Sequence, residues 1–232
     1  MNPQFELVSP PETAWQRRVR LAVDVVDAVT GELIRDGIKV TVKEFRSEPI
    51  VNASGRFVWL IEPGVVPTEV EVDPQRLPYL KQTRPVPAPD LPLPPRTPQY
   101  NIVRVELPPT SAYPFEAGTT GVRGTLILDS TVFPPVPLPA HEVWLQWSDD
   151  NQPLPGWTDA LLHADTDAAG DFAVIVRLAT NQIARTDAQG RMQVRVAATH
   201  EGITKFSPPL QIRPGYVADV TPSLAWNQFT TL

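Results

Sequence analysis

The fold is decided by a short phrase that occurs three times: NASGRFVWL (Asn52 to Leu60), TDAAGDFAV (Thr166 to Val174) and TDAQGRMQV (Thr186 to Val194). Each copy has Asn or Asp, then Ala, one variable residue, Gly, one charged residue and a large apolar residue that opens an alternating run. The side-chain oxygen of Asn or Asp initiates a tight turn, and Gly takes the positive φ that a Cβ opposes. The phrase therefore predicts a turn that leads directly into a strand.

The large apolar residue after each turn fixes the register of the strand. We expect Phe57, Phe172 and Met192 to be the first residues of their strands that face a core. Because side chains alternate between the two faces of a strand, a slip of one residue would send each of them into solvent. Turn and strand register are therefore predicted together.

The rest of the chain continues the strand pattern. Apolar and polar residues alternate with period two in RVRLAVDVVD (18–27) and IKVTVKEF (38–45). Proline, which lacks a backbone donor and interrupts helices, accounts for 28 residues and leaves little room for long helices. Single helical turns are predicted at 157–163 and 179–184. Further strands are predicted at 56–64, 69–72, 100–107, 121–128, 141–147, 171–178, 191–198 and 207–213.

The strands divide into two tandem domains. The stretch 84–98 holds seven prolines and has the composition of a polyproline linker. Because the strand at 100–107 would otherwise be orphaned, we interpret this stretch as a long loop inside the first domain. The predicted divisions are an extended arm (1–14), a first β-sandwich (15–109), a second β-sandwich (110–215) and a C-terminal tail (216–232) that either packs as a strand or docks on a partner.

The order of these motifs resembles the carboxypeptidase regulatory-like module, also called transthyretin-like or prealbumin-like. The resemblance is carried by VDAVTGELIRDGIKVTV (26–42) with NASGRFVWLIEPG (52–64), and again by GVRGTLIL (121–128), PLPAHEVWL (137–145) and TDAAGDF (166–172). It implies an all-β fold of two tandem Ig-like or prealbumin-like antiparallel β-sandwiches. It implies little about activity, since such modules are mostly noncatalytic spacers or docking domains.

The sequence departs from the pattern of that module at two places. Val51-Asn52 stands where the module has Thr-Asp, and the second domain carries an extra copy of the phrase at 186–192. The strand count or the strand pairing of the second domain is therefore expected to differ from that of the module.

Composition excludes several classes of function. The formal net charge is −6, whereas nonspecific binding to nucleic acid or to an anionic membrane needs a basic surface, so neither is expected as a partner. The absence of cysteine removes thiolate nucleophiles and thiolate metal sites. The N-terminus, MNPQFELVSPPE, has no basic start and no apolar core of a signal peptide, which predicts synthesis in the cytoplasm.

One stretch resembles the start of a calcium-binding loop, with Asp165, Asp167 and Asp171 as candidate ligands. A complete loop needs oxygen ligands at its fifth and twelfth positions, where this sequence has Ala169 and Val176. A turn is therefore favoured over a metal site, and no cofactor is expected. The three histidines lack metal-ligand spacing, and the chain has neither a nucleophile elbow nor a phosphate-binding loop, so an enzyme is not expected.

Tryptophans gather near acidic and amide side chains at Trp144, Trp147 and Trp157. Aromatic platforms of this kind hold sugars in β-sandwich lectins. On an alternating strand, however, Trp144 and Trp147 face opposite ways, so that one belongs to a core and the other is exposed. Packing or protein contact is favoured, and a carbohydrate platform made of Trp147 and Trp157 is the alternative.

Two β-sandwiches without a catalytic constellation predict a structural or docking protein that binds other subunits of an assembly. The tension between modules typical of exported proteins and a missing export signal favours a particle built in the cytoplasm, such as a virion or a phage-tail-like contractile particle. The alternatives are a surface or carbohydrate-binding module and an accessory domain of a separate enzyme. The expected contact residues lie in the proline loop, on the tryptophans and in the aromatic tail: Pro87, Pro92, Pro95, Trp147, Trp157, Trp226 and Phe229.

Overall fold

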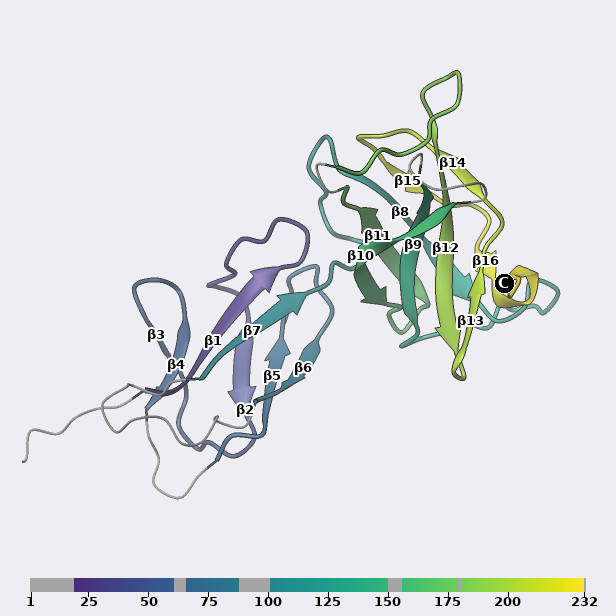
Figure 1. The fold of residues 1–232 in the computed structure, drawn as a ribbon. Helices are drawn as coiled ribbons and strands as arrows, with labels where there is room; N and C mark the ends of the chain where they lie inside the picture. The colour runs from purple at the N-terminus through teal and green to yellow at the C-terminus, as the bar shows by residue number, and fades with distance from the viewer. Residues whose placement is uncertain (1–18, 61–65, 88–100, 150–155, 179–180, 232) are drawn as a thin grey trace, which may run out of the picture.

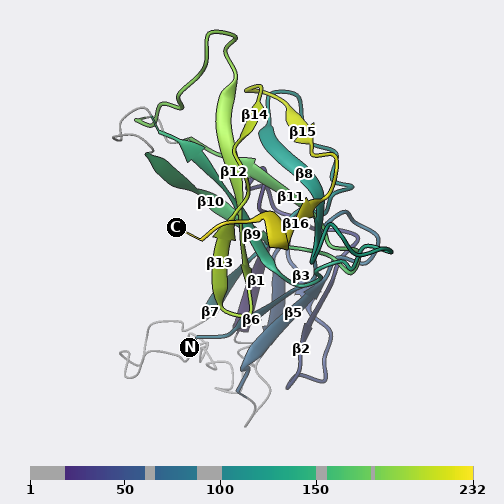
Figure 2. The same ribbon diagram turned by 90° about the vertical axis from the view of Figure 1, so that its right-hand side faces the viewer.

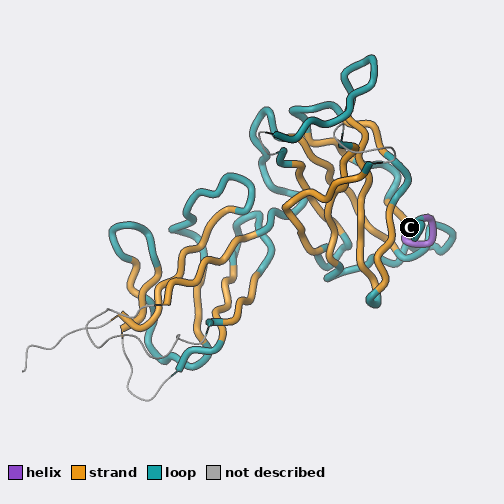
Figure 3. Tube along the Cα trace, in the orientation of Figure 1, coloured by secondary structure: helices purple, strands orange, loops and turns teal. Residues whose placement is uncertain are grey.

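The computed structural model describes residues 19–60, 66–87, 101–149, 156–178 and 181–231. Strands and loops make up almost all of this part of the chain, and a single 3-10 turn, η1 (Trp226–Gln228), lies near its end (Figure 3). The predicted all-β fold is confirmed. The strands form two groups, β1 to β7 and β8 to β16, which Figure 1 shows as two bodies joined by the chain after β7.

The N-terminal group consists of two sheets. The order of the first sheet is β3-β4-β1-β7 and that of the second is β2-β5-β6. These strands are β1 (Val19–Asp27), β2 (Lys39–Val42), β3 (Ile50–Val51), β4 (Phe57–Leu60), β5 (Glu69–Asp73), β6 (Gln82–Pro85) and β7 (Asn101–Leu107).

Alternation along the strands produces the core of the N-terminal group. Leu21, Val23 and Val25 point from β1 into the same buried cluster as Val70 and Val72 of β5. Because β1 and β5 belong to different sheets, the inner faces of the two sheets meet in one core, as in a β-sandwich.

The C-terminal group also has two layers. One sheet has the order β10-β9-β12-β13 with β14 beside β12, and the other has the order β11-β8-β15 with β16 beside β8. These strands are β8 (Thr120–Ile127), β9 (Glu142–Ser148), β10 (Trp157–Asp165), β11 (Asp171–Val176), β12 (Met192–His200), β13 (Ile203–Phe206), β14 (Leu210–Ile212), β15 (Val217–Asp219) and β16 (Leu224–Ala225).

The core of the C-terminal group lies between these layers. Val122 and Phe172 from one sheet share a buried cluster with Leu145, Trp147 and Val196 from the other. Figure 2 separates the layers, with β10, β9, β12 and β13 on the left and β8, β15 and β16 on the right. The antiparallel sandwich prediction therefore describes the layering of both groups.

Parallel pairing is an addition that the sequence pattern does not reveal. β7 pairs with β1 in parallel over seven residues, and β15 and β16 pair with β8 in parallel. In each group the first strand therefore has the last strand or strands of that group along one side. The remaining strand pairs are antiparallel.

The repeated phrase forms the same turn three times, as predicted. The Oδ1 atoms of Asn52, Asp167 and Asp187 each accept the backbone N–H groups two and four residues further on, at 2.8 to 3.0 Å. The glycine of each phrase donates its N–H to the carbonyl of that Asn or Asp at 2.9 Å. These glycines, Gly55, Gly170 and Gly190, have φ of 85°, 78° and 71°.

The apolar residue after each turn is buried, as predicted. Phe57 lies in the N-terminal core, and Phe172 and Met192 lie in the C-terminal core. The local phrase thus determines both the turn and the side of the strand that faces inward.

Two predictions of secondary structure are wrong. Residues 157–163 belong to strand β10 and not to a helical turn, because Trp157 to Asp165 pair along β9. Residues 84–85 of the expected loop are the end of β6. Strand β13 was not expected, because its sequence, ITKF, is too short to show alternation.

Residues 181–184 contain a turn and an isolated bridge from Ala184 to Asp149. The other residues of that predicted helical turn, 179–180, lie outside the described residues, as does the predicted arm 1–14.

Candidate docking surfaces

The outer face of sheet β10-β9-β12-β13 carries a row of three polar side chains. Asp159, Gln146 and Arg195 occupy directly paired positions on β10, β9 and β12. The amide of Gln146 donates Nε2–H to Asp159 Oδ1 at 2.7 Å, and its Oε1 accepts the Arg195 Nε–H at 2.7 Å. The row links three strands with hydrogen bonds from side chain to side chain.

Arg195 is held between two aromatic rings. Its guanidinium carbon lies 4.5 Å from the ring centroid of Trp157 and 4.2 Å from that of Phe206. Burial lowers the pKa of Arg195, while the charge of Asp159 acts in the opposite direction. The cation–π contacts and the bond to Gln146 therefore compensate a guanidinium that is largely removed from water.

Trp144 is covered in a similar way. Its ring stacks on the His163 ring at a centroid distance of 4.8 Å and an interplanar angle of 4°, and its Nε1–H donates to Asp159 Oδ1 at 2.7 Å. His163 in turn bonds Glu142 at 2.9 Å. The two indoles on the outer face are therefore both in contact with side chains of this chain: the His163 ring stacks on Trp144, and the Arg195 guanidinium lies over Trp157.

The predicted platform of Trp147 and Trp157 does not exist. Trp147 points into the C-terminal core and is 1% exposed, whereas Trp157 lies on the opposite face of the sheet against Arg195. Alternation along β9 predicts that Trp144 and Trp147 face opposite ways, and this is confirmed. The prediction that one of the two is exposed is wrong, because Trp144 is buried against Ala197 and Phe206. Which of the two faces of β9 lies against the other sheet is what assigns Trp147 to the core, and that depends on the tertiary packing.

The C-terminal tail packs as strands, which confirms one of its two predicted alternatives, whereas the prediction of Trp226 and Phe229 as docking contacts is wrong. Residues 217–219 and 224–225 are strands β15 and β16, and both pair with β8. Trp226 and Phe229 are buried in the C-terminal core, where their rings lie 5.9 Å apart. Because the last strands complete the sheet, these two aromatic rings are not available to a partner.

A pair of histidines lies beside Trp226. The ring nitrogens His141 Nε2 and His200 Nδ1 are 2.5 Å apart, and the His200 ring meets Trp226 edge to face at 5.4 Å. The Lys205 Nζ atom also lies over the Trp226 ring, 4.7 Å from the centroid of that ring. One imidazole must donate and the other accept, so this contact requires at least one neutral ring.

Two of the predicted proline contacts, Pro92 and Pro95, lie outside the described residues. Pro87, which follows β6, is exposed. The tertiary structure therefore places only the first of the three proline candidates at a surface.

Two of the three candidate calcium ligands, Asp167 and Asp171, accept hydrogen bonds from within the chain. Asp167 Oδ1 accepts the two backbone bonds of its own turn, and Asp171 Oδ1 accepts the Thr125 hydroxyl at 2.5 Å. Burial and then the nearby charge of Glu142 raise the pKa of Asp165, although Arg84 opposes them. Within the described ranges, no three His, Asp or Glu side chains are grouped so that they could hold a metal ion. Asn52 makes the same turn with an amide, which explains the aspartate as a turn residue.

A small cluster joins the two groups of strands. Val29 of the N-terminal group packs with Tyr113, which follows β7, and with Ile175 of β11. The buried carboxylate of Asp27 accepts the hydroxyls of Tyr79 and Tyr113 and the Val29 N–H. Burial, followed by the charge of Asp27, raises the pKa of Tyr79 to about 12, and burial raises that of Tyr113 further. Both tyrosines are therefore neutral donors at neutral pH.

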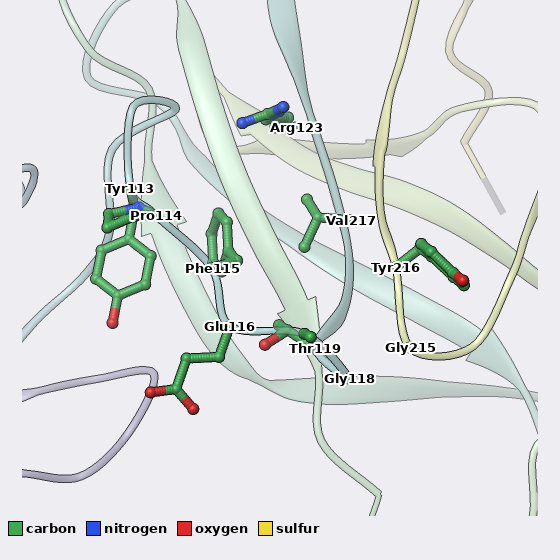
Figure 4. Close-up of a pocket in the computed structure, with 11 residues that line it drawn as sticks. Tyr113, Pro114, Phe115, Glu116, Gly118, Thr119, Arg123, Gly215, Tyr216 and Val217 are labelled. Carbon is green, nitrogen blue, oxygen red and sulfur yellow. The ribbon is translucent and has the colours of Figure 1, made fainter.

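An open pocket of about 600 Å³ lies next to this cluster. Figure 4 shows Tyr113 and Phe115 on one side and Tyr216 across from them. Arg123 in its lining is paired with Asp219, and that pair raises the pKa of Arg123. The lining offers aromatic and backbone surface, which suits packing by an apolar group.

Several exposed apolar side chains lie on the loop between β8 and β9. Phe133 is 93% exposed, and Leu128, Val132 and Val136 are exposed beside it. Other exposed apolar side chains lie elsewhere in the described residues, among them Leu161 on β10 and Tyr216 before β15. The sequence shows the loop only as one proline-rich stretch among several, so its exposure was not predicted.

Comparison with known proteins gives no family. No family model matches the chain, and no curated protein matches it. Among solved structures it is similar to one described as "The Bacillus anthracis TIE protein", with 11% identity and a TM-score of 0.27 over 88% of this chain. The match covers 33% of that chain, so this protein spans about a third of its length. The likeness is too weak to carry an argument, and the resemblance to the carboxypeptidase regulatory-like module stays a prediction.

Across the described parts of the chain, no helix is both long enough and apolar enough to cross a membrane.

Proposed function

We propose that this chain is a noncatalytic docking component of a larger protein assembly. The observation that carries the proposal is the gathering of exposed apolar side chains, Val132, Phe133 and Val136, on one loop of a well-packed sheet. Single exposed apolar residues are common, but contiguous apolar patches mark interaction sites. A buried partner surface explains why this loop remains apolar.

The polar groups of the outer face support a structural role. Asp159, Gln146 and Arg195 bond one another across three strands, and Trp144 adds its N–H to the same carboxylate. Side chains that could bind or transfer protons in an enzyme serve here to connect strands.

The particular assembly that we propose is a particle of the phage-tail-like contractile kind, which follows the expectation from the sequence. Synthesis in the cytoplasm and incorporation into such a particle are parts of this proposal. Neither nucleic acid nor a bilayer is proposed as a partner, in keeping with the net charge of −6.

The test is fractionation of particles from the source organism. Mass spectrometry of particles purified by sedimentation is expected to detect this chain in a fixed ratio to the major subunits. Deletion of the gene is expected to remove this chain from the purified particles without removing any enzymatic activity of the particles. Particles that lack the chain, or a chain found only in the unassembled fraction, would contradict the proposal.

Binding of carbohydrate is the weaker candidate. Trp147 is buried in the core. His163 stacks on the Trp144 ring, and Arg195 lies over the Trp157 ring. A glycan array is expected to give no specific signal. Specific binding that Trp157→Ala abolishes would restore the carbohydrate hypothesis.

A further inference from the structure

The loop from Leu128 to Pro137, LDSTVFPPVP, connects β8 to β9 and presents an aromatic ring to solvent. Every residue in it except Asp129 is exposed, and the Phe133 side chain is 93% exposed. Its Phe133–Pro134 peptide bond is cis. An exposed phenylalanine forgoes the free energy that burial of its ring would give. This loop therefore offers more apolar surface to a partner than any single exposed residue would.

The base of the loop is closed by backbone hydrogen bonds. The Leu128 N–H donates to the Val136 carbonyl at 2.8 Å, and Ile127 forms a bridge with Pro137. The two ends of the loop are thus held beside each other, and Phe133 lies between them in the chain.

The C-terminal 3-10 turn supports one arm of the loop. Asn227 donates its N–H to the Leu128 carbonyl at 3.2 Å and its Nδ2–H to Asp129 Oδ1 at 2.7 Å. Gln228 donates Nε2–H to the Ser130 hydroxyl at 3.0 Å. Because these contacts already hold residues 128–130, a partner would pay little conformational entropy to order this arm of the loop on binding.

Proline chemistry limits how a partner can bind the loop. Pro134, Pro135 and Pro137 have no N–H, so this segment cannot add to the edge of another sheet as a regular strand. What it offers is an aromatic ring, pyrrolidine faces and carbonyl acceptors. A matching surface must therefore be apolar and must supply donors.

Charge distinguishes a protein partner from a bilayer. Residues 124–140 contain no Lys or Arg, and the single acidic residue, Asp129, is bonded to Thr131 and Asn227. A loop that inserts into an anionic bilayer is normally flanked by basic residues. The charge pattern fits an uncharged pocket in a protein.

We propose that the loop 128–137 inserts Phe133 into an apolar pocket of a neighbouring protein subunit. The pocket is lined by aromatic side chains whose indole N–H or phenol O–H groups donate to the carbonyls of the proline run. This proposal rests on the proposed docking function and names the surface that performs it.

The experiment compares Phe133→Ser with Leu161→Ser in the source organism. Leu161 is 83% exposed on β10 and is a matched control for the loss of one exposed apolar side chain. Particle-bound chain is expected to fall at least about tenfold for Phe133→Ser, which corresponds to the loss of one buried anchor residue, and to change less than about twofold for Leu161→Ser. Both variants are expected to keep the melting temperature of the wild type, since both side chains are exposed.

The outcomes separate the two proposals. Wild-type chain absent from particles would overturn both the docking function and this surface. Phe133→Ser bound as well as wild type would overturn the surface alone. Two further results would also overturn it: cosedimentation with phosphatidylcholine–phosphatidylglycerol vesicles that Phe133→Ser abolishes, and self-association of the purified chain that the same variant abolishes.

A photocrosslinking side chain at position 133 tests the chemistry of the pocket. We expect one discrete adduct with another subunit of the particle, on a segment rich in Trp, Tyr or Phe. Adducts scattered over several subunits, or placed on a charged surface, would contradict an aromatic pocket.

Discussion

The turn at Asp167–Gly170 and the turn at Asp187–Gly190 are locally alike but lie in different surroundings. Both have an Asp Oδ1 that accepts two backbone N–H groups, and their glycines have φ of 78° and 71°. A Cβ added to Gly170 would lie on the Leu126 carbonyl oxygen, whereas a Cβ added to Gly190 would meet no atom within 4 Å.

The threonine before each turn also differs between the two copies, in burial and in hydrogen bonding. Thr166 is buried, and its hydroxyl donates to the Leu138 carbonyl and accepts the His141 N–H. Thr186 is exposed and forms one isolated bridge, to Met192. The same sequence phrase therefore makes one turn that packs against β8 and the loop that follows it, and one turn that is open to water.

This comparison teaches that the phrase determines a conformation but not its importance to stability. Backbone conformation follows from the Asp side chain and the glycine, which lie within five residues. The cost of changing those residues depends on β8 and on the loop after it, some forty residues away in sequence.

The largest expected effect separates the two glycines. Gly170→Ala must adopt positive φ and displace a backbone carbonyl, and is expected to lower the free energy of unfolding by about 3 kcal/mol or more. Gly190→Ala has only the cost of placing an alanine at positive φ, and is expected to lower the free energy of unfolding by about 1 kcal/mol. Urea denaturation of the two variants measures both values. Equal losses would show that the Leu126 contact has no energetic weight.

Gly55→Ala is expected to fall between them. Its added Cβ would meet the Arg35 side chain, with Nε at 2.6 Å, and that flexible side chain can move away. The expected loss is about 1 to 2 kcal/mol, slightly above that of Gly190→Ala. A loss as large as that of Gly170→Ala would mean that Arg35 is held more firmly than its surface position indicates.

Substitution of Thr166 and of Thr186 by valine is expected to separate the two turns by the next largest difference in the free energy of unfolding. Thr166→Val leaves the Leu138 carbonyl and the His141 N–H without their hydroxyl partner, at a cost of about 2 kcal/mol. Thr186→Val is expected to change the free energy of unfolding by less than about 0.5 kcal/mol. Thermal unfolding of both variants under the same conditions measures the difference. A comparable loss at both positions would contradict the assignment of Thr186 to the open turn.

The smallest effect is a dependence on pH at the open turn. The backbone N–H of Arg191, more than its side chain, lowers the pKa of Asp187 below the usual value. A carboxyl with a lowered folded-state pKa stabilises the protein above its unfolded pKa, and this contribution is lost as the pH falls through the folded pKa. Asp187→Asn keeps the acceptor oxygen, as Asn52 shows, but has no charge to lose.

The melting temperatures of wild type and Asp187→Asn are therefore expected to differ slightly at pH 7 and to converge as the pH falls below about 4. A difference that grows on acidification would contradict this linkage. Because Asp187 is at the surface, added salt should also reduce the difference.

Pattern alone predicted much of the fold but little of the surface. Alternation placed Phe57, Phe172 and Met192 in the cores, because strand geometry is local. It could not assign Trp226 to the core, since that burial depends on β16 pairing with β8 across nearly one hundred residues. Nor could it distinguish the ordered loop at Phe133 from the other proline-rich stretches.

The amino-acid sequence by itself determined that this chain forms strands joined by glycine turns, because an Asx side chain, a positive φ and period-two alternation act over a few neighbouring residues. Tertiary structure decided which copies of the turn are packed against backbone, which tryptophans are buried and which apolar loop remains in solvent. Those properties depend on contacts between segments far apart in the chain, and no short stretch contains the information about its distant neighbours.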